Sequence, residues 1–270
     1  MDLSIILVNW NTLELLRRCL ASLQAQSAGE SGLATDIWVI DNGSTDSSPD
    51  MVRREFPGVH LVCNAANLGF AQANNQGIRG SQSRLVLLLN SDTVVPLGTL
   101  VVLVRFMDAH TEAGACGLRL VRPDGSPQPY AFGQDPMPGY LLRRGLTRLL
   151  FHRSMHDWAT DQVGVTDWVS GACLLLRRDA LDQVGLLDEK FFMYYEDNDL
   201  CLRLRRAGWK VFYNPQASVV HLGGQSLQHS PRAQHVYQES LRYFYAKHYG
   251  PAAQMLLGLG LRAYNALRGT

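Results

Sequence analysis

Acidic and amide side chains follow apolar runs at several points in the chain. Asn90-Ser91-Asp92 comes directly after the apolar residues 85–89, and Asp41-Asn42-Gly43-Ser44-Thr45-Asp46 comes after a shorter apolar run. Carboxylates such as Asp92 can hold a hard cation, which takes oxygen ligands from carboxylates and from substrate phosphates. The same residue types also form turns, so each cluster taken alone is open to a structural interpretation.

The cluster 41–46 has the composition of a nucleotide pocket as well as that of a turn. The carboxylate of Asp41 would stand at a strand end and could accept hydrogen bonds from a ribose or a base edge. Gly43 would let the backbone approach a ligand closely. The chain contains neither Gly-x-Gly-x-x-Gly nor Gly-x-x-x-x-Gly-Lys-Ser/Thr, which argues against a dinucleotide-binding Rossmann site and a P-loop.

Amide residues and a glycine mark a further cluster, residues 67–77. Gly69 precedes a predicted helix, whose N-terminus could hold an anionic group. Asn74 and Asn75 fall inside that helix, where asparagine is a poor helix former. Simple exposure to solvent is the alternative, but two adjacent asparagines with no capping role favour a function.

Three carboxylates crowd together in Glu196-Asp197-Asn198-Asp199. Their mutual repulsion raises their proton affinity, so one of them could act as a general base. An acidic first turn favoured by the helix dipole is the alternative. The aromatic run at residues 191–195 favours a site lined by aromatic side chains over a solvent-exposed helix start. His221 ends the last predicted strand, and a lone histidine is more often structural than a ligand.

The elements that must position these residues alternate regularly over the first 110 residues. Apolar runs predict buried strands at 3–8, 36–40, 59–62 and 85–89, and helical patterns predict helices at 13–26, 51–56, 70–79 and 98–109, with Thr12 as an N-cap. This alternation predicts a parallel sheet with right-handed crossovers. The polar clusters should therefore gather along one edge of the sheet.

The second half is less regular. Strands are expected at 115–121, 165–169, 172–176, 211–213 and 217–221, and helices at 179–184, 197–207, 233–249 and 252–267. Residues 126–164 contain several prolines and the arginines Arg143, Arg144, Arg148 and Arg153, as expected of a functional or disordered loop. The predicted organisation is a catalytic domain over 1–225, with halves 1–110 and 111–225, and a helical extension over 226–270.

Bulk composition excludes several classes of protein. A net charge of +1 argues against a dedicated nucleic-acid binder. Five scattered cysteines without a Cys-x-x-Cys pair indicate reduced thiols rather than zinc or disulfides. The N-terminus lacks a signal-peptide pattern, and no apolar run approaches the roughly 20 residues needed to cross a bilayer. We expect a cytoplasmic protein, soluble or peripheral at the inner face of the cytoplasmic membrane.

Taken together, these motifs resemble the family 2 inverting glycosyltransferases with the GT-A fold, in particular their rhamnosyltransferase-like branch. The resemblance covers residues 3–222 in one consistent order, and it rests on residues 8–11, 41–46, 67–77, 89–92, 171–178, 185–192 and 196–203. It implies an α/β Rossmann-like sandwich with a mainly parallel central sheet and C-terminal helices.

The resemblance also implies roles for individual residues. Asp197 would be the base, with Glu196 second, and Asp92 would hold Mg²⁺ or Mn²⁺ together with His221. Trp168, Ser170 and Gly171 would border the acceptor. Many relatives carry Asp at position 90, so Asn90 lowers the charge at the metal. The residues implied to bind the nucleotide or donor are Asn9, Asn11, Asp41, Asn42, Gly43, Ser44, Asp46, Asn67, Gly69, Asn74, Asn90 and Ser91.

By this resemblance the chain would transfer rhamnose or a similar hexose in cell-surface or cell-wall polysaccharide synthesis. The donor would be dTDP-rhamnose, or else a UDP-sugar, and the acceptor a glycan or a lipid-linked saccharide. The apolar C-terminal tail at residues 255–261 fits membrane contact, a homodimer interface or packing on the catalytic domain. The alternatives are a nucleotidyltransferase, which should show a Gly-rich N-terminal loop that residues 8–12 lack, and a catalytically silent nucleotide-sugar-binding module.

Overall fold

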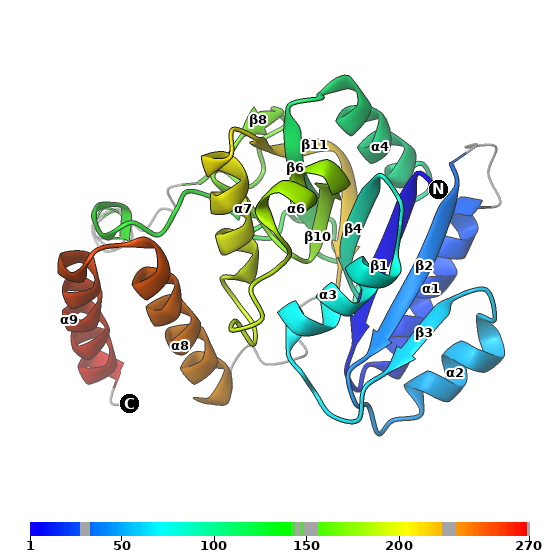
Figure 1. The fold of residues 1–270 in the computed structure, drawn as a ribbon, viewed down its shortest axis with the longest axis horizontal. Helices are drawn as coiled ribbons and strands as arrows, with labels where there is room; N and C mark the ends of the chain where they lie inside the picture. The colour runs from blue at the N-terminus through cyan, green and yellow to red at the C-terminus, as the bar shows by residue number, and fades with distance from the viewer. Residues whose placement is uncertain (28–32, 142, 144–146, 148–155, 223–230, 269–270) are drawn as a thin grey trace.

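A mixed β-sheet with helices on both faces forms the centre of the molecule (Figure 1). The computed structural model describes residues 1–270 except 28–32, 142, 144–146, 148–155, 223–230 and 269–270. Arg144, Arg148 and Arg153 therefore lie outside the described residues. The strand order within the described chain is β3-β2-β1-β4-β10-β6-β11-β5, and β8 pairs with β11.

The first half of the sheet is parallel, as the alternation of apolar runs predicts. Strands β1 (Leu3–Asn9), β2 (Thr35–Asp41), β3 (His60–Cys63) and β4 (Leu85–Asn90) pair in parallel, with β1 between β2 and β4. The helices of this half are α1 (Leu13–Ser27), α2 (Ser48–Glu55), α3 (Phe70–Gly80) and α4 (Thr99–Ala109).

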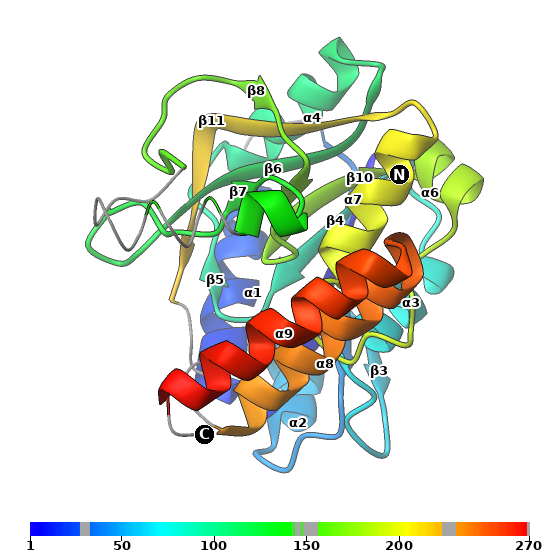
Figure 2. The ribbon, with the colours of Figure 1, turned by 90° about the vertical axis from the view of Figure 1, so that its left-hand side faces the viewer.

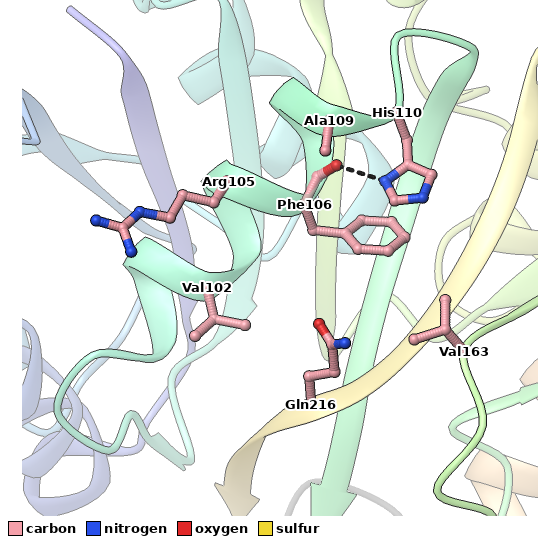
Figure 3. A pocket seen from close by; sticks show the side chains of 7 residues that line it. All are labelled: Val102, Arg105, Phe106, Ala109, His110, Val163 and Gln216. Carbon is pink, nitrogen blue, oxygen red and sulfur yellow. Dashed lines mark hydrogen bonds between the residues drawn. The ribbon is translucent and has the colours of Figure 1, made fainter.

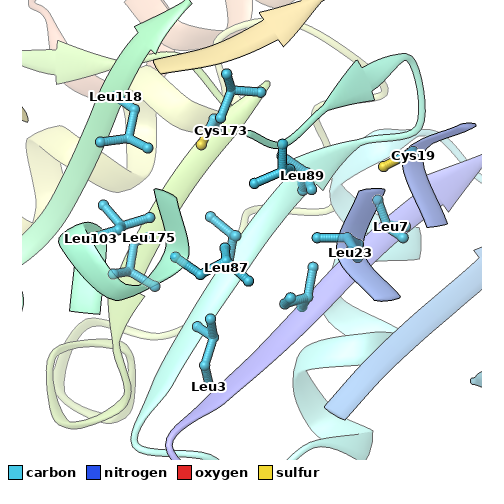
Figure 4. Close-up of a cluster of buried hydrophobic side chains, with 14 of the residues drawn as sticks. Leu3, Leu7, Cys19, Leu23, Leu87, Leu89, Leu103, Leu118, Cys173 and Leu175 are labelled. Carbon is cyan, nitrogen blue, oxygen red and sulfur yellow. The ribbon is translucent and has the colours of Figure 1, made fainter. Parts of the chain in front are cut away.

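Strand β4 is buried on both faces. Leu85, Leu87 and Leu89 belong to the core cluster that contains side chains of α1 and α4 (Figure 4). Val86 and Leu88 belong to a second cluster, which contains side chains of α3 and of α7 (Glu196–Arg206). An uninterrupted apolar run is what such a doubly covered strand requires, so the prediction for this strand is confirmed.

The second half departs from the predicted strand limits. Strand β10 (Cys173–Arg177) is antiparallel to β4 and to β6 (Ala113–Val121). Two separate strands were expected at 211–213 and 217–221, but one long strand, β11 (Lys210–His221), runs parallel to β6 with a register shift between Asn214 and Ser218. Asn214 Oδ1 accepts a hydrogen bond from Gln216 N, and this local turn interrupts the alternation that a sequence pattern detects.

The prediction of a single strand at 165–169 is also wrong. It is two short strands, β8 (Gly164–Val165), which pairs with β11, and β9 (Trp168–Val169), which pairs with β7 (Phe132–Gly133) in a separate sheet. A further short strand, β5 (Thr93–Val94), follows β4, and helix α6 (Arg178–Val184) follows β10. Between β8 and β9 the chain passes from the main sheet to the second sheet within four residues. The hydrophobic pattern of the sequence does not reveal such a change.

Two C-terminal helices, α8 (Pro231–His248) and α9 (Pro251–Arg268), pack as a pair beside α7 (Figure 1). The expected break at residues 250–251 is present: Tyr249 and Gly250 separate the helices, and Pro251 is the first residue of α9. Leu241, Phe244 and Tyr245 of α8 form a buried cluster with Phe191 and Tyr195, which precede α7. Among the described helices, none has the length and apolarity needed to span a membrane.

Candidate active site

A buried hydrogen-bond network joins the ends of β1 and β2. Asn9 and Asp41 are 0% and 2% exposed. Asn9 Nδ2 donates to Asp41 Oδ1 at 2.9 Å and to Ser44 Oγ at 3.0 Å, and Ser44 N donates to Asp41 Oδ2 at 2.9 Å. Because β1 and β2 are parallel neighbours with Asn9 opposite Asp41, the pairing of the sheet brings these residues together. The carboxylate is thereby fixed at the sheet edge.

Asn11 and Thr12 extend this network toward β4. Asn11 has a φ of +55°, and its N–H donates to Ser44 Oγ at 2.9 Å. Thr12 Oγ1 lies 2.7 Å from Asn9 Oδ1 and 3.0 Å from Ser91 Oγ. The predicted residues Asn9, Asn11, Ser44 and Ser91 thus form one connected group. Thr12 joins it, although the sequence indicated for Thr12 only a capping role.

Thr12 precedes α1, as predicted, and its backbone oxygen accepts a hydrogen bond from Leu16 N at 2.8 Å, while Asp46 supplies the side-chain hydrogen bond to the helix start. Asp46 Oδ2 accepts the hydrogen bond of Leu13 N at 2.9 Å, and Oδ1 accepts that of Ser48 N at 3.1 Å. Burial raises the pKa of Asp46, but these hydrogen bonds outweigh it and the pKa is lowered. The predicted helix start after Thr12 is confirmed, but a side-chain hydrogen bond supplied from 33 residues away has no local sequence signal.

Asn42 and Asn67 hold the loop before α3 to the end of β2. Asn42 Nδ2 donates to Asn67 Oδ1 at 2.9 Å and to Gly69 O at 3.1 Å, while Asn42 Oδ1 accepts from Leu68 N at 3.0 Å. Asn67 Oδ1 also accepts from Gly69 N. Asn42 and Asn67 were predicted to bind the nucleotide or the sugar donor. In the structure these side-chain hydrogen bonds are instead made to other protein groups.

Gly43 and Gly69 are required by close protein packing. Gly43 has a φ of +79°, and a Cβ there would meet Ala66 Cα at 2.8 Å. Gly69 has a φ of +87°, and its Cβ would meet Phe192 O at 2.6 Å. The first N–H of α3, that of Phe70, donates to Phe192 O at 2.7 Å. The N–H group expected to bind an anion at this helix start is thus bonded to a protein carbonyl. The backbone of Gly43 closely approaches Ala66 of another loop, where a close approach to a ligand was expected.

The two asparagines of α3 are buried, at 1% exposed each. Asn75 donates to Leu187 O at 2.8 Å and accepts from Leu187 N at 3.1 Å, so it clamps α3 to the segment before α7. Asn74 Nδ2 donates to Phe70 O within the helix. Burial excludes the alternative of solvent-exposed asparagines. Asn75 therefore has a structural role in the described contacts. The sequence could not reveal it, because the partner, Leu187, is 112 residues away in the chain.

The predicted metal ligands lie together where β4 and β11 end. His221 Nε2 lies 3.1 Å from Asp92 Oδ1 and 3.3 Å from Asn90 Nδ2, and His221 Nδ1 lies 2.8 Å from Gln128 Oε1. A hydrogen bond from Nδ1–H to Gln128 leaves the lone pair on Nε2, on the side of Asp92. Gln128 is a residue that the sequence analysis missed. Its loop position carried no signal.

This donor set fits a divalent cation that is shared with a substrate. Asp92 offers a carboxylate, His221 an imidazole nitrogen, and Asn90 an amide oxygen on rotation of its side chain. Within the described residues no group of three or more His, Cys, Asp or Glu side chains could hold a metal ion. Mg²⁺ and Mn²⁺ commonly bind one or two carboxylates and complete their coordination with substrate phosphates and water, so the residues present fit that mode.

Asp197 lies in the first turn of α7 and is partly exposed. Its Oδ2 accepts a hydrogen bond from Gly171 N at 2.9 Å, and its Oδ1 accepts one from Asn198 N at 2.8 Å. Burial raises the pKa of Asp197, and these two donors only partly offset the rise. Asp197 is therefore a more basic carboxylate than usual that an approaching hydroxyl can still reach.

Glu196, its neighbour, is 5% exposed. Its Oε2 has no hydrogen-bond partner within the described part of the chain. Burial first, and then the negative charge of Asp197, raises the pKa of Glu196 well above its ordinary value. The two adjacent carboxyl groups thus differ in access, and Glu196 favours its protonated form.

The predicted acceptor residues connect Asp197 to the motif at residues 90–92. Gly171 N donates to Asp197, and the next residue, Ala172, accepts a hydrogen bond from Asn90 N at 3.0 Å. Trp168 Nε1 donates to Gln134 O at 2.9 Å, and Ser170 Oγ accepts from Ala172 N at 3.3 Å. Two consecutive residues therefore link Asp197 to the strand end that carries Asp92.

A third carboxylate of the same turn, Asp199, is 0% exposed and faces α8. It lies 2.8 Å from Arg203 Nε, 2.7 Å from Lys247 Nζ and 2.6 Å from His248 Nε2. Burial raises its pKa, but the hydrogen bonds from His248 and Lys247 and the charge of Arg203 outweigh this and lower it to about 2. Asp199 is thus a structural carboxylate that joins the acidic turn to the C-terminal helices.

A surface pocket of the described chain lies elsewhere. It has a volume of about 480 Å³ between α4 and β11 and is lined mostly by Val102, Phe106, Ala109 and Val163 (Figure 3). None of the predicted site residues lines it. This pocket is therefore separate from the polar network at the sheet edge that defines the candidate site.

Comparison with known proteins shows the family of this chain. Residues 4–185 match the sequence profile of glycosyl transferase family 2. The chain belongs to this family. It is 33% identical over 256 residues to the N-acetylglucosaminyl-diphospho-decaprenol L-rhamnosyltransferase of Mycobacterium tuberculosis, covering 85% of this chain and 78% of that one. It is 26% identical over 166 residues to the rhamnosyltransferase WbbL of Escherichia coli, covering 57% and 60% of the two chains.

Solved structures show the same fold. The mannosyltransferase PcManGT of Pyrobaculum calidifontis, solved with GDP-Man and Mn²⁺, has a TM-score of 0.63 at 19% identity and covers 95% of this chain and 68% of that one. GalNAc-T7, solved with UDP, GalNAc and Mn²⁺, has a TM-score of 0.65 at 17% identity, covering 90% and 47%. The GT-A fold and the rhamnosyltransferase-like branch are thereby confirmed, and the chain is a sugar transferase of glycan biosynthesis.

Proposed function

We propose that this protein is an inverting, metal-dependent glycosyltransferase that uses Asp197 as its base. The observation that carries the proposal is the short link from Asp197 through Gly171 and Ala172 to Asn90. This link holds a basic carboxylate close to the strand end with Asp92 and His221. A base on one side of a reacting centre and a site for a charged leaving group on the other are the two requirements of a single displacement.

The reaction follows from these positions. Asp197 accepts the proton of an acceptor hydroxyl while that oxygen attacks the anomeric carbon of the donor sugar. A new C–O bond forms on one face, and the bond to the nucleoside diphosphate breaks on the opposite face, so the anomeric centre inverts. The hydroxyl proton ends on Asp197, and the electron pair leaves with the diphosphate.

Asp92, His221 and Asn90 would hold the divalent ion, Mg²⁺ or Mn²⁺, which when bound offsets the charge of the leaving diphosphate. On the protein side, Gln128 keeps the imidazole of His221 turned toward Asp92. Asp41 would receive the nucleotide, since its carboxylate is fixed at the adjacent strand end by Asn9 and Ser44.

The branch to which the chain belongs supports a rhamnose donor, dTDP-rhamnose first and a UDP-hexose second. Its Mycobacterium relative is named for a decaprenol-linked acceptor, which supports a hydroxyl of a lipid-linked glycan as the acceptor here. A cytoplasmic location at the inner face of the membrane accords with that acceptor. Trp168, Ser170 and Gly171 lie beside Asp197 and would border the acceptor sugar.

The test separates the base from its neighbour with two isosteric variants, Asp197→Asn and Glu196→Gln. Sugar transfer and donor hydrolysis are measured with a panel of nucleotide sugars, Mg²⁺ or Mn²⁺, and a soluble acceptor analogue. Loss of a general base costs about 10²–10⁴ in rate, so D197N should lose that much kcat and keep its nucleotide affinity. E196Q should stay within about tenfold, since Glu196 favours its protonated form.

The pH profile gives a second readout. Transfer requires Asp197 without its proton, so kcat/KM should fall as pH drops through the pKa of Asp197, which lies above the ordinary value of 3.8. Unchanged turnover in D197N would remove Asp197 as the base. Nucleotide binding without turnover by the native protein, with every donor offered, would instead favour a catalytically silent module.

A further inference from the structure

The outermost helix of the molecule, α9, is apolar on two opposite faces. It lies over α8 on the side away from the sheet (Figures 1 and 2). Ala253, Leu257 and Leu261 pack inward against the cluster that α8 forms with the segment before α7. This inner face resolves one expectation: the C-terminal helices do pack on the catalytic part of the chain.

The outer face of α9 is the unusual one. Met255, Leu256 and Leu259 are 63%, 55% and 54% exposed, and Ala252 and Ala263 are exposed on the same face. Spacings of three and four residues align these side chains along the helix. At about 1.5 Å per residue the stripe extends over roughly 15–20 Å. A contiguous exposed apolar stripe marks an interaction surface more often than a scattered single residue does.

The charges around this stripe are those of a helix that contacts anionic lipids. Helix α9 has no acidic residue, and Arg262 is exposed beside the stripe. Over residues 231–270 the chain has five Arg or Lys and a single Glu, Glu239; of the five, Lys247 is paired with Asp188 and Asp199. Helices with an apolar face and basic flanking residues lie in the interfacial plane of a bilayer, where basic groups meet anionic headgroups.

We infer that α9 docks the protein on an anionic lipid bilayer through Met255, Leu256 and Leu259. The choice of a bilayer over a second copy of the chain rests in part on the proposed function, since a lipid-linked acceptor must be met at a membrane. Helix α8 carries α9 on one side and bonds to Asp199, two residues from Asp197, on the other. Docking would therefore present the acceptor side of the candidate site to the lipid surface.

Co-sedimentation of the whole protein with vesicles tests the inference without any use of turnover. The vesicles are phosphatidylcholine alone or phosphatidylcholine mixed with phosphatidylglycerol. The double variant Leu256→Ser with Leu259→Ser removes the stripe. Leu97→Ser is the matched control, because Leu97 is 76% exposed just before α4 and far from α9 in sequence. Light scattering of the free protein reports its oligomeric state.

The native protein and L97S should bind the mixed vesicles, less tightly as salt increases, and the double variant should bind roughly tenfold or more weakly. Equal binding by all three proteins, or none by the native protein, would overturn the inference. So would a native dimer that the double variant converts to a monomer. The proposed function would fail on its own if the protein still bound vesicles but transferred no sugar to a soluble acceptor.

Discussion

At the scale of single residues, Asn90 is the most informative residue of the motif 90–92. Its amide Nδ2 lies 3.3 Å from His221 Nε2, where a carboxylate would add a second negative charge. Asp92 is the only carboxylate of this motif. Affinity for a hard cation is tuned by the number of charged ligands, so an amide at position 90 should give weaker metal binding than a carboxylate there.

Asn90→Asp should add that charge. We expect the concentration of Mn²⁺ that gives half-maximal transfer to fall by about tenfold, since one added charged ligand next to the ion contributes about 1–2 kcal/mol when partly screened. Metal titration of the transfer rate measures this. Ser91→Asp, one residue along, is the control that adds the same charge. An unchanged metal requirement in N90D would place the ion away from position 90.

Residue types predicted candidates well, but they could not reveal the partner of each side chain. Asn9, Asp41 and Ser44 do lie together, because Asn9 and Asp41 end neighbouring parallel strands and Ser44 follows in the loop after Asp41. Asn42 and Gly43 come from the same cluster, yet Asn42 binds the loop before α3 and Gly43 approaches Ala66. The same asparagine or glycine suits a ligand or a loop, and only the tertiary packing decides between them.

At the scale of elements, the joint between α7 and α8 ties the acidic turn to the C-terminal extension. Asp199 bonds to Lys247 and His248, and Ser240 Oγ donates to Met193 O at 2.7 Å. Helix α8 thereby contacts both the segment before α7 and its first turn. This contact fixes the helix start that carries Asp197.

Replacement of Asp199 by Asn should destabilise the protein by about 3 kcal/mol, because it leaves the partly exposed Arg203 and Lys247 without their buried carboxylate. Denaturant unfolding measures the change. Asp182→Asn, at an exposed position on α6, is the control and should change stability by less than about 0.5 kcal/mol. A similar small effect in D199N would show that the buried cluster contributes little.

The contact of Asp199 with α8 also predicts how the stability of the protein changes with pH. The pKa of Asp199 is depressed from 3.8 to about 2 in the folded state. Its stabilising contribution, about 2 kcal/mol, is therefore complete above pH 3.8 and is lost as pH falls toward 2. D199N should lack that part of the acid dependence.

Elements with one dominant local signal were predicted closely from the sequence, and those set by distant contacts were not. The strands over 85–89 and 172–176 have uninterrupted apolar runs and appear as β4 and β10. Strands β8 and β9 are two residues long and owe their existence to partners in different sheets. The antiparallel insertion of β10 between β4 and β6 likewise depends on long-range pairing.

At the scale of the whole molecule, the parallel strand ends, the motif at residues 90–92 and the start of α7 meet at one edge of one sheet. The network around Asp41 and the pair Asp92 and His221 come from different strands. A nucleoside diphosphate that bridges them would bind the folded chain only, because the unfolded chain does not bring these groups together. Ligand binding should therefore appear as thermal stabilisation.

A matching nucleoside diphosphate at about 100 times its Kd should add about 2.7 kcal/mol, which corresponds to a Tm increase of about 5–10 °C. Thermal unfolding with dTDP, UDP and GDP, with and without Mn²⁺, measures it. Mn²⁺ should enlarge the shift in the native protein, and Asp92→Asn should keep the nucleotide shift but lose the metal increment. Asp41→Asn should lose both, since the metal is shared with the bound diphosphate. A metal increment that persists in D92N would instead place the cation among other groups of the chain.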